Sequence, residues 1–460
     1  MRMRLHPVRP GFGASVWLAM AAWGVCALAS GDARAQGSKE TRETGPTLER
    51  SHPDHVPLRP TVPPAFIIPV DSFGFSPPAS FYLGQRFSMA SLDFLDEDRL
   101  LFTFRVPGLI HRQPRSGDDE EGDERHIKAL VLALPAGTVE AEAVWALHDR
   151  WRYLWMLKDG RFLLRDRDEL RQGDASLELK PYLRFPGPVL EVGMDPSQEF
   201  LVTNSREPAP TAPKASDAPG SATAGADVAA DRDAPKGREP LPNLVLRILR
   251  RDSGKVMLVS RVRSEVHLPI NSDGYLELLP GRNADWVVNL NSFDGSSSKL
   301  GEVDSTCSPT YDFVSQREFL VTTCTRQDLR SLVAMSTDGR HLWEDLPSSS
   351  PVWPLYVMGA DGSRLARESL AVNHPVTAFS PLSFDDVKGQ LVEVFDSATG
   401  KIALAAPLSP IFDAGGNVAI SPSGRRVAVL NAGAIQVFDI PAPAAMPAAP
   451  EQTQAVKSGP

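Results

Sequence analysis

A short unit recurs seven times along the sequence, and it constrains the fold more than any other feature. Each copy has an apolar run, a turn rich in Asp, Gly, Ser or Pro, and a second apolar run. Runs joined in this way predict tight β-hairpins. The copies occupy residues 92–104, 153–165, 190–203, 267–279, 311–323, 355–367 and 418–430. Most successive turns lie about 40–45 residues apart once the low-complexity stretch 207–242 is set aside, which is the period of a β-propeller blade.

A second hairpin follows most of these units, so that such a unit contains four strands. These second hairpins are residues 244–260, 391–406, 286–303, 332–345 and 130–145. The seventh unit ends one strand short, after residues 435–440. The early stretch 65–70, AFIIPV, is apolar enough to supply the missing outer strand and close the ring without a long exposed edge. We therefore predict an all-β fold, a propeller of seven four-stranded blades over residues 63–440, with an open β-sandwich as the alternative.

Two stretches of the last units carry a family resemblance. Residues 421–440 (SPSGRRVAVLNAGAIQVFDI) and 392–401 (VEVFDSATGK) resemble the WD-repeat and YVTN-type blades of exported bacterial propellers. The resemblance is sharp over the last blade and a half and architectural over residues 65–440. The Gly-His and Trp-Asp dipeptides of true WD repeats are missing. The resemblance therefore implies the fold and says little about a ligand.

The N-terminus has the form of a secretory signal. Three arginines fall among the first nine residues, residues 14–30 are an almost uncharged apolar run, and Ala33-Arg34-Ala35 has a small-x-small cleavage pattern. We predict that residues 1–35 are removed between Ala35 and Gln36, and that the protein is periplasmic or secreted. The alternative is a retained membrane anchor, for which the apolar run is at the short limit.

Several segments have too few large apolar side chains to fold. Residues 36–62, 207–242 and 441–460 are rich in Pro, Ala and polar residues, and we predict that they are disordered. Residues 115–125 concentrate six carboxylates. They could collect a calcium ion loosely, but the EF-hand spacing is absent and a solvated loop is the favoured interpretation.

The net charge excludes some classes of partner. The formal charge of the chain is −9, and residues 1–35 carry four arginines and one aspartate, so the exported chain would carry −12. Nucleic acids and anionic membranes are bound through a basic face, which this composition does not favour. We predict no nucleic-acid partner and no membrane span after cleavage of the signal.

Two cysteines, Cys307 and Cys324, remain after cleavage, and they are placed symmetrically about the turn of the fifth hairpin. If Val314 and Arg317 flank a two-residue turn as a hydrogen-bonded pair, the cysteines form a non-hydrogen-bonded pair with Cα atoms about 4.5 Å apart. That separation suits a disulfide, which an oxidising compartment would allow to form. The alternative is a redox-active pair, although no C-x-x-C motif is present.

Local catalytic motifs are absent. No H-E-x-x-H, G-x-S-x-G or phosphate-binding loop occurs, and the histidines after the signal are scattered. A propeller can draw one metal ligand from each blade, so we single out His148 with Asp149, and His374, which lie between units where loops facing the channel fall. The alternative for each is a surface or hydrogen-bonded histidine. The adjacent cysteines of quinone-dependent propellers are also missing, and we predict no cofactor.

Two groups of aromatic residues lie between units. They could form a platform for a peptide or glycan, or they could pack between blades, which is the favoured interpretation. The residues are Trp145, Trp151, Tyr153 and Trp155 in one group, and Trp343, Trp353 and Tyr356 in the other.

Two functions remain open at this point. The favoured one is a monomeric, non-catalytic exported scaffold that binds a protein or another macromolecule. The alternative, implied by resemblance to lactonase-like propellers, is a hydrolase with a metal in the central channel. Carboxylates and a histidine converging in the channel would favour the hydrolase, whereas an apolar or small-residue channel would favour the scaffold.

Overall fold

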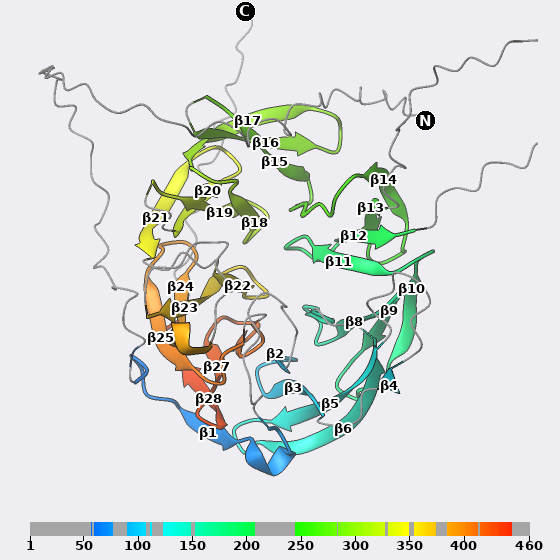
Figure 1. Ribbon diagram of the computed structural model, residues 1–460, viewed down its shortest axis with the longest axis vertical. Coiled ribbons are helices and arrows are strands. Elements are labelled where there is room, and N and C mark those ends of the chain that lie inside the picture. The colour runs from blue at the N-terminus through cyan, green and yellow to red at the C-terminus, as the bar shows by residue number, and fades with distance from the viewer. Residues whose placement is uncertain are drawn as a thin grey trace, which may run out of the picture. The chain divides into compact units, whose positions relative to one another are not determined.

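The structure is a computed structural model in which the blades follow one another around a ring (Figure 1). It describes residues 57, 59–76, 90–106, 111–112, 123–148, 152–207, 244–282, 284–326, 330–348, 354–373, 384–412 and 415–443. The predicted signal and its cleavage site, most of residues 36–62, the insert beyond residue 207 and most of the tail lie outside these ranges. In the described part of the chain, none of the helical segments has the length and apolar character needed to span a membrane.

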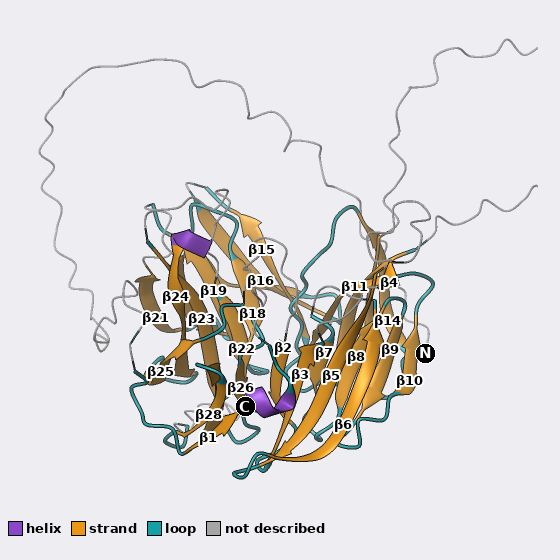
Figure 2. Ribbon diagram, turned by 60° about the horizontal axis from the view of Figure 1, so that its bottom comes forward, coloured by secondary structure: helices purple, strands orange, loops and turns teal. Residues whose placement is uncertain are grey.

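Seven antiparallel sheets form the blades, and strands make up more than half of the described residues (Figure 2). Blade 1 contains β2 (Ala90–Phe94), β3 (Arg99–Arg105), β4 (His111–Arg112), β5 (Asp123–Ala133) and β6 (Thr138–Leu147). Blade 2 contains β7 (Leu154–Met156), β8 (Phe162–Asp166), β9 (Glu169–Gly173) and β10 (Lys180–Arg184). Blade 3 contains β11 (Val189–Met194), β12 (Phe200–Arg206), β13 (Leu244–Arg250) and β14 (Val256–Val262).

The remaining blades follow in chain order. Blade 4 contains β15 (Gly274–Pro280), β16 (Asp285–Ser292) and β17 (Ser297–Asp304). Blade 5 contains β18 (Thr310–Phe313), β19 (Glu318–Cys324), β20 (Arg330–Ser336) and β21 (His341–Ser348). Blade 6 contains β22 (Leu355–Met358), β23 (Arg364–Val372), β24 (Val387–Asp396) and β25 (Ile402–Leu408). Blade 7 contains β26 (Val418–Ile420), β27 (Arg426–Asn431), β28 (Ala434–Asp439) and the N-terminal β1 (Phe66–Pro69). Two 3₁₀ turns lie outside the sheets, at Asp71–Phe73 and Phe384–Asp386.

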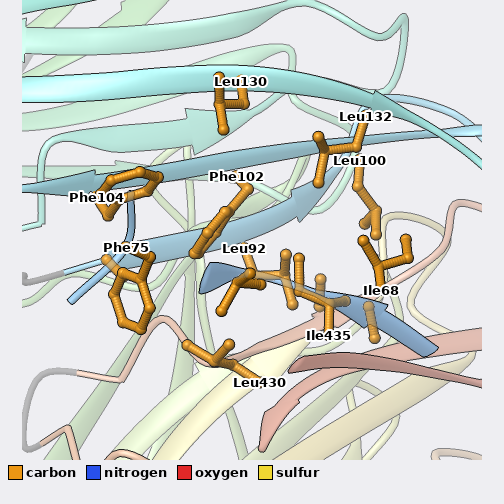
Figure 3. Close-up of a cluster of buried hydrophobic side chains, with 14 of the residues drawn as sticks. Ile68, Phe75, Leu92, Leu100, Phe102, Phe104, Leu130, Leu132, Leu430 and Ile435 are labelled. Atoms are coloured by element: carbon orange, nitrogen blue, oxygen red, sulfur yellow. The ribbon is translucent and has the colours of Figure 1, made fainter. Parts of the chain in front are cut away.

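The N-terminal strand closes the ring as predicted. β1 pairs antiparallel with β28, with Phe66 opposite Val437 and Ile68 opposite Ile435. Ile68 points into a buried cluster that joins blade 7 to blade 1 (Figure 3). Closure therefore adds a strand from the N-terminal end of the propeller to a blade whose other strands come from the C-terminal end.

Each of the seven interfaces between neighbouring blades has its own apolar cluster in the described residues. The cluster between blades 7 and 1 has 17 buried members, including three phenylalanines with ring centroids 5.0–5.5 Å apart. The cluster between blades 3 and 4 has five: Phe200, Val202, Leu246, Ile248 and Ile270. The apolar core is therefore distributed unevenly around the ring.

Blade 4 departs from the sequence prediction because its innermost strand is missing. We expected a hairpin over residues 267–279, but only its second strand forms, and a single bridge between Ile270 and Tyr275 remains of the first. Pro269 has no N–H to donate to a ladder. The Asn271 side chain accepts hydrogen bonds from the N–H groups of Asp273 and Gly274, which favours a turn at that point.

The predicted disulfide between Cys307 and Cys324 is present, with Cα atoms 5.6 Å apart. The predicted register of its hairpin is wrong by one residue, since Phe313 pairs with Phe319 and the Val314 N–H donates to the Glu318 carbonyl oxygen. The cysteines are nevertheless bonded, because Cys307 lies in the connection from blade 4 and not in β18, which begins at Thr310. The register of the hairpin therefore does not fix the position of Cys307. The bond therefore ties that connection to β19.

The outer hairpin of blade 2 was not predicted from the sequence. β9 and β10 of blade 2 are short and carry several charged residues, so they lack the apolar runs that marked the other hairpins. Their pairing is nevertheless continuous with β8. Blade 2 therefore reaches four strands without an apolar outer hairpin.

Candidate functional site at the ring centre

The strands at the inner edges of the sheets place charged side chains around the ring axis. Five of them form what we call the central cluster: Asp93, Arg152, Glu191, His267 and Asp312. Asp93, Glu191 and Asp312 lie on β2, β11 and β18. Arg152 lies two residues before β7, and His267 lies in the connection from blade 3 to blade 4. Blades 1 to 5 thus each contribute one charged group.

His267 bridges two blades that are not neighbours in the ring. Its Nδ1 lies 2.9 Å from Glu191 Oε1 of blade 3, and its Nε2 lies 2.8 Å from Asp312 Oδ1 of blade 5. Burial alone would lower the pKa of His267, but the hydrogen bonds to Asp312 and Glu191 raise it to about 10. The imidazole is therefore a cation at neutral pH, and it donates from both nitrogens.

A second contact holds Glu191 in place. The Asn204 side-chain amide of β12 donates to Glu191 Oε2 at 3.0 Å and to the Val266 carbonyl oxygen at 2.8 Å. Asn204 is fully buried, so these bonds fix both the carboxylate and the segment that presents His267. The bridge is therefore positioned by the interior of blade 3.

Carboxylates and a histidine do converge at the centre, which is the arrangement we expected of a hydrolase. Their chemistry is different, because a metal needs a lone pair on the imidazole and both nitrogens of His267 are occupied by carboxylates. Among the described residues no group of three His, Cys, Asp or Glu side chains has the arrangement needed to hold a metal ion. His267 of this cluster forms ion pairs with Glu191 and Asp312, and Arg152 and Asp93 are nearby charges.

Arg152 faces Asp93 and Asp312 from the start of blade 2. Its Nε donates to the Leu154 carbonyl oxygen at 3.1 Å, and its Cζ lies 5.5 Å from the centre of the Trp155 ring. Desolvation lowers the pKa of Arg152, partly offset by the charges of Asp93 and Asp312, yet solvent reaches its side chain. Burial raises the pKa of Asp93, although the Ser91 hydroxyl donates to it.

The histidines singled out from the sequence lie elsewhere. His148 follows β6 of blade 1, and its Nδ1 and its N–H lie 3.1 Å from Asp166 Oδ1 of blade 2. It therefore joins two blades, which agrees with the alternative of a hydrogen-bonded residue. Asp149 and His374 lie outside the described residues.

The described members of the two aromatic groups pack between blades. Trp145 and Trp343 are buried, and their indole N–H groups donate to the carbonyl oxygens of Leu177 and Ser397. Trp343 also stacks on Phe395. Tyr153 bonds Thr103 at 2.7 Å, Tyr356 bonds Thr322 at 3.0 Å and Trp155 is buried, whereas Trp151 and Trp353 lie outside the described residues. The packing interpretation accounts for the described residues.

The residues of the central cluster were not predicted from the sequence. His267 had a signal, since it stands at the start of the one hairpin that contains a proline in its first strand. Arg152 had none, because its importance depends on charges from blades 1 and 5 that are distant in sequence. Such clusters arise from ring closure and not from local spacing.

An exposed apolar strand is the other unusual feature. β14 is the outermost strand of blade 3, and in the described residues it pairs only with β13. Residues 256–261 are all exposed, and four of them are large and apolar, with exposed fractions of 44% for Val256, 50% for Met257, 37% for Leu258 and 56% for Val259. Other outer strands such as β17 expose mainly polar side chains.

Comparisons with known proteins add little beyond the fold. No family model and no curated protein matches the chain. Among solved structures, a Pyrococcus horikoshii acylaminoacyl peptidase is 9% identical over 74% of this chain and 49% of its own, with a TM-score of 0.39. TolB from Acinetobacter baumannii is 11% identical over 73% of this chain and 76% of its own, with a TM-score of 0.35. A chain of a mitotic checkpoint complex is 8% identical over 63% of this chain and 90% of its own, with a TM-score of 0.33.

This chain therefore spans about half the length of the peptidase. At such identities and scores the likeness extends to the fold alone. The architecture expected from the WD-repeat and YVTN-type resemblance is the one observed, and it stands on the strand pairings described above: the chain is a seven-bladed β-propeller.

Proposed function

We propose that this protein is an exported, non-catalytic propeller that binds an extended segment of a partner protein along β14. The observation that carries the proposal is the run of four exposed apolar residues, Val256 to Val259, on a strand whose outer edge is unpaired in the described residues. An exposed apolar edge strand is a template for adding another strand, and soluble proteins normally protect such edges.

The charges around β14 indicate the character of the partner. Four exposed cationic residues lie on the strand or near it in sequence, against two exposed carboxylates, in a chain whose net charge is negative. These are Arg250, Lys255, Arg261 and Arg263, and the carboxylates are Asp252 and Glu265. A segment with alternating apolar side chains and carboxylates would complement this surface in both respects.

Export is part of the proposal. The signal-like pattern of residues 1–35 and the disulfide between Cys307 and Cys324 both suit an oxidising compartment. Native mass spectrometry of the exported protein should give the mass of a chain that begins at Gln36, less two hydrogens. One metal ion bound per chain would contradict the non-catalytic function, and free thiols would contradict export.

The binding surface is tested by photocrosslinking. A photoreactive amino acid at position 258 should capture a partner from the exported fraction, whereas the same probe at Val144, an exposed valine on the outer strand β6, should not. With the probe kept at position 258, Val259→Lys should abolish capture, and Val144→Lys should leave it unchanged. These positions are exposed, so the thermal midpoint should hardly move.

Two outcomes would contradict this function. Equal capture at positions 258 and 144 would show that β14 is not a specific surface. A homodimer that dissociates in Leu258→Lys would show that β14 pairs with a second copy of this chain and not with a different protein.

A further inference from the structure

The side chain of Arg152 has hydrogen-bonding capacity that the described residues do not use. Its Nε donates to the Leu154 carbonyl oxygen, but Asp93 and Asp312 act on the guanidinium only as nearby charges. Neither carboxylate forms an ion pair with it. The two terminal nitrogens of the guanidinium therefore have no acceptor among the described residues, and the residue is exposed.

The two nearby carboxylates are already engaged elsewhere. Asp312 accepts from His267 at 2.8 Å, and Asp93 accepts from the Ser91 hydroxyl. His267 is itself shared between Asp312 and Glu191, so its charge is balanced locally. Arg152 is thus the cation of the central cluster whose directed hydrogen bonds remain available.

We propose that Arg152 binds the carboxylate group of a singly charged ligand at the centre of the ring. A planar guanidinium with two parallel donors matches a carboxylate bidentately. Contact with the Trp155 ring and the bond to Leu154 hold the group in one orientation, which reduces the entropy lost on binding. Asp93 and Asp312 disfavour a second negative charge on the ligand. The ligand is a monocarboxylate, either a small organic acid or the C-terminus of a polypeptide.

This site is independent of the proposed function, because β14 lies at the outer edge of blade 3 and the central cluster lies at the inner edge. An experiment that contradicts partner binding along β14 therefore does not contradict ligand binding by Arg152, and the reverse also holds.

Calorimetric titration of the full chain with N-acetylglycine tests the proposal. We expect a Kd of about 1 mM, as befits a small ligand held by one charged contact. N-acetylglycinamide, which lacks the charge, should not bind, and inorganic phosphate should bind more weakly than N-acetylglycine. A longer acetylated peptide with a free C-terminus that binds more tightly than N-acetylglycine would identify the chain end as the source, and equal affinity would identify a small acid.

Variants separate recognition from structure. Arg152→Gln should weaken binding at least about tenfold. Arg152→Lys should recover only part of the loss, because lysine lacks the two parallel donors of the guanidinium. Asp93→Asn should strengthen binding, since it removes a repelling charge, and a purely structural role of Arg152 would not produce that gain. Arg161→Gln is the matched control, because Arg161 is an exposed arginine paired with Asp159.

Unchanged affinity in Arg152→Gln, or no binding of any carboxylate by the folded wild-type chain, would overturn the proposal. Circular dichroism of each variant establishes that it is folded before titration. If Arg152→Gln fails to fold, the Asp93→Asn and Arg152→Lys titrations still decide the question.

Discussion

The interface between blades 7 and 1 and the interface between blades 3 and 4 represent two ways of holding a ring together. The first has 17 buried apolar members and a strand contributed from the other end of the propeller. The second has five, and the blade beyond it lacks an inner strand. Blade 4 packs more extensively on blade 5, through a cluster of ten. The buried apolar cluster is therefore large between blades 7 and 1, where the ring closes, and small between blades 3 and 4.

Polar contacts link the blades on the side of the ring where the apolar cluster is small, around blades 3 to 5. His267 joins Glu191 of blade 3 to Asp312 of blade 5, and Gln316 donates to Asp195 at 2.9 Å across the same gap. Gln316 also accepts from the Ser272 N–H at 2.7 Å, which attaches the turn of blade 4 to the same bridge. Blades 3 and 5 are thus linked directly, past the missing strand. Directional bonds can span a gap that apolar side chains do not fill.

The largest expected effect tests whether the closing interface carries more stability. Phe102→Ala, in the cluster between blades 7 and 1, should lower the free energy of unfolding by about 3–5 kcal/mol. Phe200→Ala, between blades 3 and 4, should cost less, because Phe200 has fewer buried partners and touches the half-exposed Phe293. Urea denaturation of both variants measures the difference. Equal losses would show that cluster size does not govern stability in this ring.

The sequence predicted the strong interface and not the weak one, for a physical reason. The hairpins and the closing strand 65–70 can be recognised from local apolar patterns, because the side chains that they bury are close together in the sequence. The loss of the inner strand in blade 4 depends on Pro269 and on partners in blades 3 and 5. His267 could be noticed in the sequence, but its two carboxylates lie 76 and 45 residues away along the chain. Sequence reasoning therefore recovered the scaffold and missed the site.

The disulfide offers a second test of the weak side. Cys307→Ser with Cys324→Ser removes a crosslink with a sequence separation of 17 residues, which should cost about 3 kcal/mol. Because Cys307 lies on the connection from blade 4 to blade 5, hydrogen exchange should rise in β18 and β19. Exchange in β1 and β28 should stay as in the oxidised protein. A uniform rise around the ring would mean that the two sides unfold as one unit.

A buried carboxyl in blade 6, next to the closing blade, gives the free energy of unfolding a pH dependence of its own. Glu368 of β23 is 2% exposed, and burial raises its pKa to about 8. The folded chain then holds a proton that the unfolded chain releases from about pH 4.5, so stability should fall as the pH rises from 4.5 to 8. The slope should be about 1.4 kcal/mol per pH unit. Glu368→Gln should flatten this part of the curve, and an unchanged slope in thermal or urea denaturation would contradict the assignment.

The smallest expected effect on stability comes from the titration of His267. This titration should affect the side of the ring around blades 3 to 5 and not the interface between blades 7 and 1. Its pKa is raised above the unfolded value, so its bridge stabilises the fold fully below about pH 6.5 and loses that contribution as the pH rises towards 10. The side chain is half exposed, so solvent screening keeps the effect modest. In a Glu368→Gln background, which removes the slope of the same sign below pH 8, His267→Gln should reduce the remaining pH dependence between 6.5 and 10. Hydrogen exchange should place that loss in β11 and β18, because the bridge holds those strands together across the gap, whereas the described members of the apolar cluster between blades 7 and 1 include no histidine.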